Sequence, residues 1–256
     1  MSHTSRPHTR ARRSLLVAGT LAGTVAIAMA VNSASAAPPP PAPPVVNCVV
    51  SDGVTQTATS VRGTGRNDTI NCGAGSPGKT ISGLGGDDSI TGTAFADTIY
   101  GAAGNETITG GPVVSTFGDI MFGGVGNDTM TGNAGNDTMT GDAGNDTMTG
   151  SAGVDTLNAN DGLDTLTGSA GNDTLNGGAH DDILNGGDND DILLGSDGND
   201  ILNGDPGKDD LSGEKDNDIL RGHSADGSVD TLKGGAGTDD CQGPAPDGDI
   251  LSTCNP

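Results

Sequence analysis

The chain lacks tryptophan and has only one tyrosine, three phenylalanines and 11 basic residues among its 256 residues. Its 34 acidic residues leave a formal net charge of −23, so nucleic-acid phosphates and anionic lipids should repel it. With so few large apolar side chains and 45 glycines, an ordinary core would bury too little to offset the entropy lost on folding. We therefore expect no nucleic-acid partner, and either a disordered chain or a fold held together by something besides its core.

The first 36 residues have the pattern of an export signal. Residues 1–13 carry four arginines and no acid, residues 14–31 form an apolar run, and Ala34 and Ala36 match a signal-peptidase site. We predict cleavage after Ala36 and a secreted, extracellular protein that remains in the medium or at the cell surface without inserting into a membrane. An uncleaved membrane anchor is the alternative. Arg12-Arg13 weakly resembles a twin-arginine signal, but we favour the general secretory route.

Removing residues 1–36 takes away four arginines and no acids, so the mature chain would carry 34 − 7 = 27 excess negative charges. Residues 37–46 include six prolines and predict an extended linker. Residues 47–62 have room for a hairpin around Asp52-Gly53 and predict an N-terminal cap. Residues 63–256 are predicted to form one repeat domain with a C-terminal cap.

Four cysteines remain, at positions 48, 72, 241 and 254. Three pairings are possible, and the sequence alone does not choose among them. We favour Cys48–Cys72 and Cys241–Cys254, which would each contribute about 2–4 kcal/mol at the two ends of the repeat domain. A zinc site is the weaker alternative, because no C-x-x-C spacing occurs and the histidines are distant in sequence.

A nine-residue repeat dominates the rest of the chain. An aspartate recurs every nine residues, twelve times without a slip, at Asp119, Asp128, Asp137, Asp146, Asp155, Asp164, Asp173, Asp182, Asp191, Asp200, Asp209 and Asp218. A Met or Leu follows two residues after each aspartate. The phase extends back to Asp97 and Asp88 and forward, after a three-residue insertion, to Asp230 and Asp239. We expect loops at two insertions, near residues 112–117 and 223–228.

Two well-kept units read Gly-Gly-Val-Gly-Asn-Asp-Thr-Met-Thr at 123–131 and Gly-Asn-Ala-Gly-Asn-Asp-Thr-Met-Thr at 132–140. They resemble the RTX (hemolysin-type) calcium-binding nonapeptide repeat, G-G-x-G-x-D-x-U-x, in which U is a large aliphatic residue. The resemblance covers about residues 63–251. It implies an all-β fold, a right-handed parallel β-roll (a β-solenoid) with two nonapeptides per coil, and multiple Ca²⁺ ions bound by the glycine–aspartate turns between coils.

The residues fit this implication. If each unit is a six-residue turn followed by a three-residue strand, the aliphatic residue points inward and its two neighbours point outward. The fourth turn position is usually Gly, which indicates a positive φ. His180, Asn189 and Asp216 replace this glycine and tolerate that conformation, whereas Phe117 does not fit the pattern.

Stacked coils would bring aspartates 18 residues apart close together, where like charges repel. Since one buried aliphatic residue per nine offers little burial, we expect a divalent ion between the carboxylates to supply the main cohesion. Oxygen ligands without His or Cys nearby favour Ca²⁺ over transition metals and Mg²⁺. All twelve array aspartates are predicted metal ligands, and their ten pairs could hold ten ions. Lys79 and Glu106 replace aspartates upstream, which argues against ion binding before Asp119.

The sequence predicts a secreted, non-catalytic stalk, spacer or adhesion protein. No G-x-S-x-G, H-E-x-x-H or EF-hand pattern occurs, and His180 and His223 are interpreted as turn or loop residues. We expect the metal-free chain to be largely unfolded, since metal binding would supply its folding energy, and this suits secretion of an unfolded chain. A disordered Gly/Asp-rich polyanion is the alternative, although disorder would not require the strict aliphatic phase.

A surface-binding function is the other candidate. Outward threonines such as Thr129, Thr147 and Thr165 would lie about 4.8 Å apart on neighbouring strands, as in ice-binding solenoids. Threonine is also simply a common exposed strand residue. Ile183, Ile201 and Ile219 would form an apolar stripe for a cell-envelope component, a partner protein or a second copy of the chain.

Overall fold

The computed structural model describes residues 48–73, 75–112, 117–223, 227–242 and 248–254. The chain divides into Met1–Ala42 and Pro43–Pro256, and all described residues belong to the second unit. The predicted export signal at 1–36 and linker at 37–46 lie outside the described residues and stay predictions. Every regular element in the described part is a strand, and no helix there could cross a membrane.

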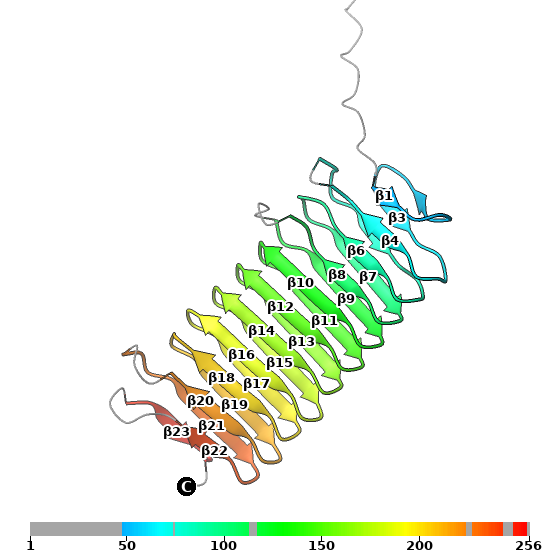
Figure 1. Ribbon diagram of the computed structural model, residues 1–256. Coiled ribbons are helices and arrows are strands. Elements are labelled where there is room, and N and C mark those ends of the chain that lie inside the picture. The colour runs from blue at the N-terminus through cyan, green and yellow to red at the C-terminus, as the bar shows by residue number, and fades with distance from the viewer. Residues whose placement is uncertain (1–47, 74, 113–116, 224–226, 243–247, 255–256) are drawn as a thin grey trace, which may run out of the picture. The chain divides into compact units, whose positions relative to one another are not determined.

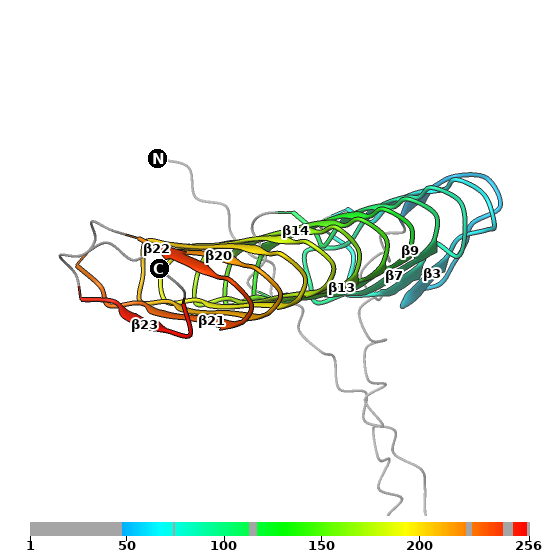
Figure 2. The ribbon, with the colours of Figure 1, turned by 90° about the horizontal axis from the view of Figure 1, so that it is seen from below.

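The strands form two sheets, which Figure 2 shows as opposite walls of a continuous coil. Sheet A contains Val49–Val50 (β1), Thr69–Asn71 (β4), Ser89–Thr91 (β6), Thr107–Thr109 (β8), Thr129–Ala134 (β10), Thr147–Ala152 (β12), Thr165–Ala170 (β14), Ile183–Asp188 (β16), Ile201–Asp205 (β18), Ile219–Gly222 (β20) and Asp240–Gln242 (β22). Sheet B contains Thr55–Gln56 (β2), Ser60–Arg62 (β3), Thr80–Ser82 (β5), Thr98–Ala103 (β7), Ile120–Val125 (β9), Thr138–Ala143 (β11), Thr156–Asp161 (β13), Thr174–Ala179 (β15), Ile192–Asp197 (β17), Asp210–Lys215 (β19), Thr231–Ala236 (β21) and Ile250–Ser252 (β23).

From β3 onward, consecutive strands alternate between the two sheets, so two nonapeptides make one coil (Figure 1). From β3 and β4 onward the strands within each sheet are parallel, and partners in the regular array lie 18 residues apart: Thr129 pairs with Thr147, and Thr147 with Thr165. The predicted parallel β-roll is thus confirmed. The predicted outward ladder of threonines also exists, since these pairs are in register.

The two insertions leave the pairing intact. Across the first, Thr107 pairs with Thr129, and across the second, Asp210 pairs with Thr231, so the offset grows while the register is kept. Residues 113–116 and 224–226, which lie inside the insertions, are outside the described residues. The strands on both sides of each insertion therefore stay paired, and the predicted loops themselves remain predictions.

A single column of aliphatic side chains per sheet forms the core. These residues are Ile in the first coils, from Ile70 to Ile108, then Met from Met121 to Met148, then Leu from Leu157 to Leu232. Each is at most 1 % exposed. One buried aliphatic residue per nonapeptide, between two more exposed neighbours, confirms the period-two alternation that the sequence predicted.

The strands are longer than predicted. Most strands of the regular array contain six residues, because the pairing between strands continues past the first glycine of the next repeat. Asn133 lies opposite Ser151 and Ala134 opposite Ala152. Asn133 does this with φ of 80°, and other second-position residues share the conformation. The positive φ predicted for the fourth position is also present, including at His180, Asn189 and Asp216.

The first coil differs from the predicted hairpin around Asp52-Gly53. Those residues join β1 to β2, which lie in different sheets and do not pair. Instead β1 pairs antiparallel with β4, and β2 pairs antiparallel with β3 through a turn at Thr57–Ser60. The turn at Gly53 therefore carries the chain from sheet A to sheet B. The antiparallel strands β1 and β2 each cover an edge of their own sheet.

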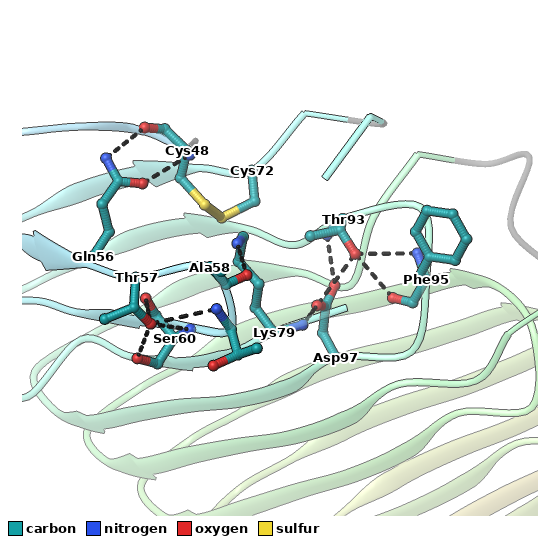
Figure 3. The surroundings of a disulfide bond; sticks show 11 residues. Cys48, Gln56, Thr57, Ala58, Ser60, Cys72, Lys79, Thr93, Phe95 and Asp97 are labelled. Carbon is teal, nitrogen blue, oxygen red and sulfur yellow. Dashed lines mark hydrogen bonds between the residues drawn. A yellow bond between two sulfur atoms is a disulfide. The ribbon is translucent and has the colours of Figure 1, made fainter. Parts of the chain in front are cut away.

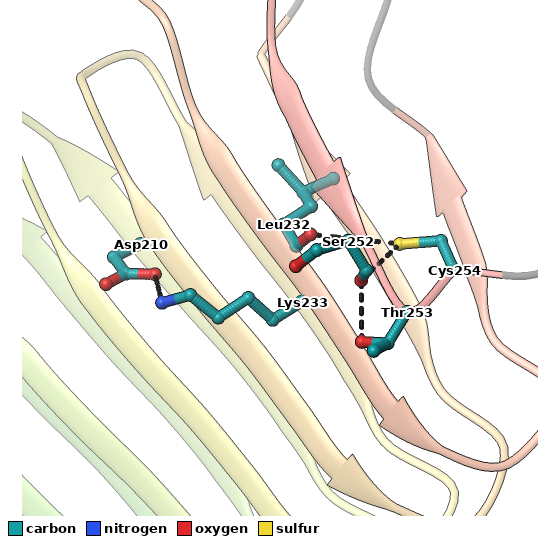
Figure 4. A network of polar contacts seen from close by, with 6 residues as sticks. All are labelled: Asp210, Leu232, Lys233, Ser252, Thr253 and Cys254. Atoms are coloured by element: carbon teal, nitrogen blue, oxygen red, sulfur yellow. Dashed lines mark hydrogen bonds and ion pairs between the residues drawn. The ribbon is translucent and has the colours of Figure 1, made fainter.

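Both favoured disulfides are present. Cys48 is bonded to Cys72 and Cys241 to Cys254, and the partners are 24 and 13 positions apart in the sequence. The second bond links β22 to the second residue after β23, so it joins the two sheets at the last coil. Close by, the Lys233 ammonium forms an ion pair of 2.6 Å with Asp210 across neighbouring strands of sheet B (Figure 4).

Candidate metal-binding ladders

The twelve array aspartates lie in the turn directly before each strand, and they form two columns. Ladder A precedes the strands of sheet A and comprises Asp128, Asp146, Asp164, Asp182, Asp200 and Asp218. Ladder B precedes the strands of sheet B and comprises Asp119, Asp137, Asp155, Asp173, Asp191 and Asp209. All twelve are at most 3 % exposed. A chain with this excess of acid thus buries a regular series of carboxylic acids.

Neighbouring aspartates of each ladder are linked by hydrogen bonds. The backbone N–H of Asp128 donates to Oδ1 of Asp146 at 2.8 Å, and that of Asp146 donates to Oδ1 of Asp164 at 2.7 Å. The same bond joins all ten predicted pairs, at 2.6–2.9 Å. The structure therefore brings together the aspartates that the 18-residue spacing paired.

The second carboxylate oxygen of these residues has no partner. Oδ2 is buried without a hydrogen bond in every array aspartate except Asp119. A buried acceptor without a donor costs about 1–3 kcal/mol, and more when it is charged. Each of these eleven oxygens, arranged in two columns, is an acceptor that a cation or a proton could satisfy.

With one exception, each unpartnered Oδ2 atom lies close to the backbone of the glycine five residues before its aspartate. A Cβ added at Gly132, the first residue of its repeat, would overlap Oδ2 of Asp137 and lie 2.8 Å from the carbonyl oxygen of Gly150. The same crowding recurs before the other array aspartates, except at Asp164, where Ala159 takes the glycine position. Carboxylate and carbonyl oxygens from successive coils therefore converge on one small space.

Burial raises the pKa of all twelve aspartates. It raises the pKa of Asp182 and Asp209 to about 8, and that of Asp146, Asp155 and Asp191 to about 7. The backbone N–H bond from the preceding coil lowers each pKa in part, while neighbouring aspartate charges raise it. Without a counter-ion, these carboxylates would hold protons near neutral pH.

The donor set fits Ca²⁺. It consists of hard oxygen atoms, buried carboxylates beside backbone carbonyls, which Ca²⁺ prefers over softer ligands. Within the part of the chain that the structure describes, no three or more His, Cys, Asp or Glu side chains converge on a point. An ion held here by aspartates of one ladder would take its remaining ligands from backbone carbonyls and water.

The ligand set predicted from the sequence was limited to the twelve array aspartates and left out other acids of the same kind. Asp88, Glu106, Asp239 and Asp249 also have buried side-chain oxygens without a partner, and burial beside the Asp128 carboxylate raises the pKa of Glu106 to about 8. The aspartate phase already contained Asp88 and Asp239. The ladders therefore extend beyond the twelve array positions in both directions.

A further column of hydrogen bonds, the outer amide ladder, runs along the outside of the turns and is formed mostly by asparagine side chains. The backbone N–H of Asn127 donates to Oδ1 of Asn105, and that of Asn145 donates to Oδ1 of Asn127, both at 2.8 Å. Asp181, Asn199 and Asn217 continue the pattern further along. These residues occupy the position directly before the buried aspartate. The backbone N–H groups of the outer residue and of the aspartate therefore both donate to side chains of neighbouring coils. The sequence signal was the recurrent Asn-Asp pair.

Comparison with known proteins gives a family match and no curated relative. A family model described as RTX calcium-binding nonapeptide repeat (4 copies) matches residues 82–112, 115–148, 122–157, 158–193 and 185–220. No curated protein matches the chain significantly. The matched segments contain every aspartate of ladders A and B.

Proposed function

Because this chain belongs to the RTX calcium-binding nonapeptide repeat family, and is thus a calcium-binding β-roll protein, we propose that ladders A and B are its calcium sites and that the ions fold it. The observation that carries this proposal is the series of buried, unpartnered Oδ2 atoms. Bound Ca²⁺ supplies positive charge between carboxylates that otherwise repel. The chain supplies the oxygen atoms and the glycine turns that leave room for them.

In this proposal calcium binding and folding are one equilibrium. The protein is exported through its N-terminal signal as an unfolded chain, and it folds in the millimolar Ca²⁺ outside the cell. Its role there is mechanical, as a spacer or adhesion element. Two observations support a non-catalytic role. His180 is a turn residue with φ of 85°, and the buried acids of ladders A and B are accounted for as calcium ligands.

Circular dichroism of the oxidised chain in EGTA, and then after adding CaCl₂, tests the proposal. We expect most of the strand signal to develop only with calcium. Isothermal titration of the same sample should show several ions binding with the transition. Equal strand signal in EGTA and in calcium, or no heat of binding, would contradict calcium-driven folding.

The outward face of sheet A supports a second candidate, recognition of a surface. Strands β6, β8, β10, β12 and β14 carry no charged residue, although the chain is strongly acidic. Thr129, Thr147 and Thr165 are in register on this face. Binding to cell envelopes in calcium would be lost on Thr147→Arg and kept on Thr156→Arg, which changes sheet B. Equal binding by both variants would argue against this face.

A further inference from the structure

The two ladders begin differently from the way they continue. At Asp68, the first acid in line with ladder A, both carboxylate oxygens have donors: Oδ1 accepts from Ser51 Oγ at 2.8 Å, and Oδ2 accepts from the Thr64 N–H at 2.6 Å and Thr64 Oγ1 at 2.9 Å. Burial alone would raise the pKa of Asp68, but these hydrogen bonds hold it below its ordinary value. This buried acid is fully satisfied as an anion by the chain itself.

Ladder B likewise begins with an acid whose two carboxylate oxygens both have donors, although burial still raises the pKa of Asp97. Asp97 accepts from the Thr93 N–H through Oδ2 at 2.5 Å and from Thr93 Oγ1 through Oδ1 at 3.2 Å (Figure 3). Its Oδ1 also accepts from the backbone N–H of Lys79 at 2.5 Å. Lys79 occupies the aspartate position one coil earlier and is buried, with its ammonium donating to the Ala58 carbonyl at 2.8 Å. A cation of the chain's own thus replaces an acid at this step.

The turn conformation explains the difference. Thr64 and Thr93 occupy the second repeat position, where Asn133 and other array residues take a positive φ. A β-branched residue resists that conformation, and neither threonine adopts it. Their N–H and hydroxyl groups instead turn toward the aspartate four residues on. Where the second residue has a positive φ, as at Leu84 and Ala102, the following acid keeps an unpartnered oxygen.

The same segment is closed by bonds that need no metal. The Cys48–Cys72 disulfide joins β1 to the end of β4, and the Gln56 side chain forms two hydrogen bonds with the Cys48 backbone (Figure 3). The antiparallel strands β1 and β2 cover the two sheet edges. Between residues 48 and 103, Asp88 Oδ2 is the one orphaned buried side-chain oxygen among the described residues.

The described part of the C-terminal end is closed by the Cys241–Cys254 disulfide but keeps acids that the chain does not satisfy. Asp239 and Asp249 keep buried oxygens without a partner, and Leu251, in line with the core column, is 48 % exposed. We propose that residues 48–103 form a block that folds without calcium and serves as the template on which the calcium-dependent coils assemble toward the C-terminus. This inference rests on the proposed calcium-driven folding of the later coils.

Hydrogen exchange with mass spectrometry on the oxidised chain in EGTA tests the block. We expect peptides within residues 60–100 to exchange at least about tenfold more slowly than peptides within 128–220, and calcium to protect both regions. Rapid exchange of both regions in EGTA, with protection in calcium, would overturn the block while leaving calcium-driven folding intact. Equal protection of both regions in EGTA would overturn both ideas.

Two variants with the same charge change sharpen the test. Lys79→Asp restores the acid of the repeat, so residues 60–100 should lose their protection in EGTA and regain it in calcium. Lys208→Asp, at an exposed position, should leave this region unchanged. Thr93→Val removes the hydroxyl without changing size much, and should also speed exchange in EGTA. Protection that survives both Lys79→Asp and Thr93→Val would contradict the roles of these residues.

Discussion

The backbone N–H of Asp164 donates to Oδ1 of Asp182 at 2.8 Å, although the two residues are 18 positions apart. This bond uses one oxygen of the Asp182 carboxylate and leaves Oδ2 buried without a partner. The coil spacing therefore fixes each carboxylate with one oxygen committed to the neighbouring coil and the other available to a cation. The consequences can be measured separately for charge, packing, turn geometry and pH.

Asp182→Asn should weaken calcium binding, while Asp181→Asn should not. Asp182 is 1 % exposed and Asp181 is exposed, so the adjacent pair changes the same charge in two environments. The amide keeps an acceptor for the Asp164 N–H but loses the negative charge that attracts the ion. We expect the calcium midpoint for folding to rise at least about tenfold, or about 1.4 kcal/mol, by titration followed by circular dichroism. Equal midpoints for the two variants would contradict a ligand role for Asp182.

Leu184→Ala should destabilise the calcium-loaded protein, and Ile183→Ala should have little effect. Leu184 is fully buried, whereas Ile183 is 41 % exposed on the outer face of β16. Truncating a buried leucine costs about 2–5 kcal/mol, partly through the cavity that remains. Denaturant unfolding at saturating calcium measures the difference. Similar losses for both variants would mean that the outer face is packed against something in solution.

Gly144→Ala should disrupt the turn before Asp146. Gly144 has φ of 135°, and a Cβ there would overlap the carbonyl of Gly126 in the preceding coil. Strained backbone of this kind costs about 1–3 kcal/mol, to which the overlap adds. Gly65→Ala is the matched control, because a Cβ at Gly65 meets nothing within 4 Å. Thermal unfolding in calcium should separate the two variants, and equal melting temperatures would refute the proposed crowding.

In EGTA, acidification should promote folding. In the folded state, burial raises the pKa of Asp182 and Asp209 from an ordinary value of 3.8 to about 8. The folded state therefore binds protons more tightly than the unfolded state. A raised folded pKa stabilises the fold fully below about pH 4, and this stabilisation is lost as the pH rises through about 7–8. Strand signal in EGTA should therefore increase from about pH 8 to about pH 5.

Calcium provides the control for this pH effect. Protons compete with the ion for the same oxygens, so the calcium midpoint should rise as the pH falls. Circular dichroism titrations at both pH values measure both trends. Strand signal in EGTA that is unchanged by acid would show that carboxylate burial does not oppose folding of the metal-free chain.

The sequence predicted those parts of the structure that depend on strict periodicity. The nine-residue phase of aspartate and aliphatic residues is enough to place Leu184 in the core, because side chains alternate along a strand. The pairing of Asp164 with Asp182 and the parallel register came from the resemblance to the RTX repeat, which implies two nonapeptides per coil. The favoured local disulfides are also confirmed, although the sequence allowed three pairings.

Features that depend on local backbone conformation were not predicted. The six-residue strands continue through residues with positive φ, such as Asn133 and Ser151, whose types vary too much along the sequence to signal a common conformation. The outer amide ladder is interrupted by residues such as Leu163, so its asparagines looked like ordinary turn composition. The predicted hairpin at Gly53 was wrong because a turn signal does not say whether the flanking strands share a sheet.

The 18-residue offset between paired strands makes length a free variable of this architecture. Each coil contacts only the coils before and after it, so removing residues 146–163 would join equivalent turns and return every later strand to its own sheet. Removing only nine residues would exchange the two faces from that point onward, placing the isoleucines of β16 and β18 on the opposite wall. Evolution can therefore lengthen or shorten such a protein in steps of one full coil without redesigning either end, whereas a half step reassigns every surface that follows.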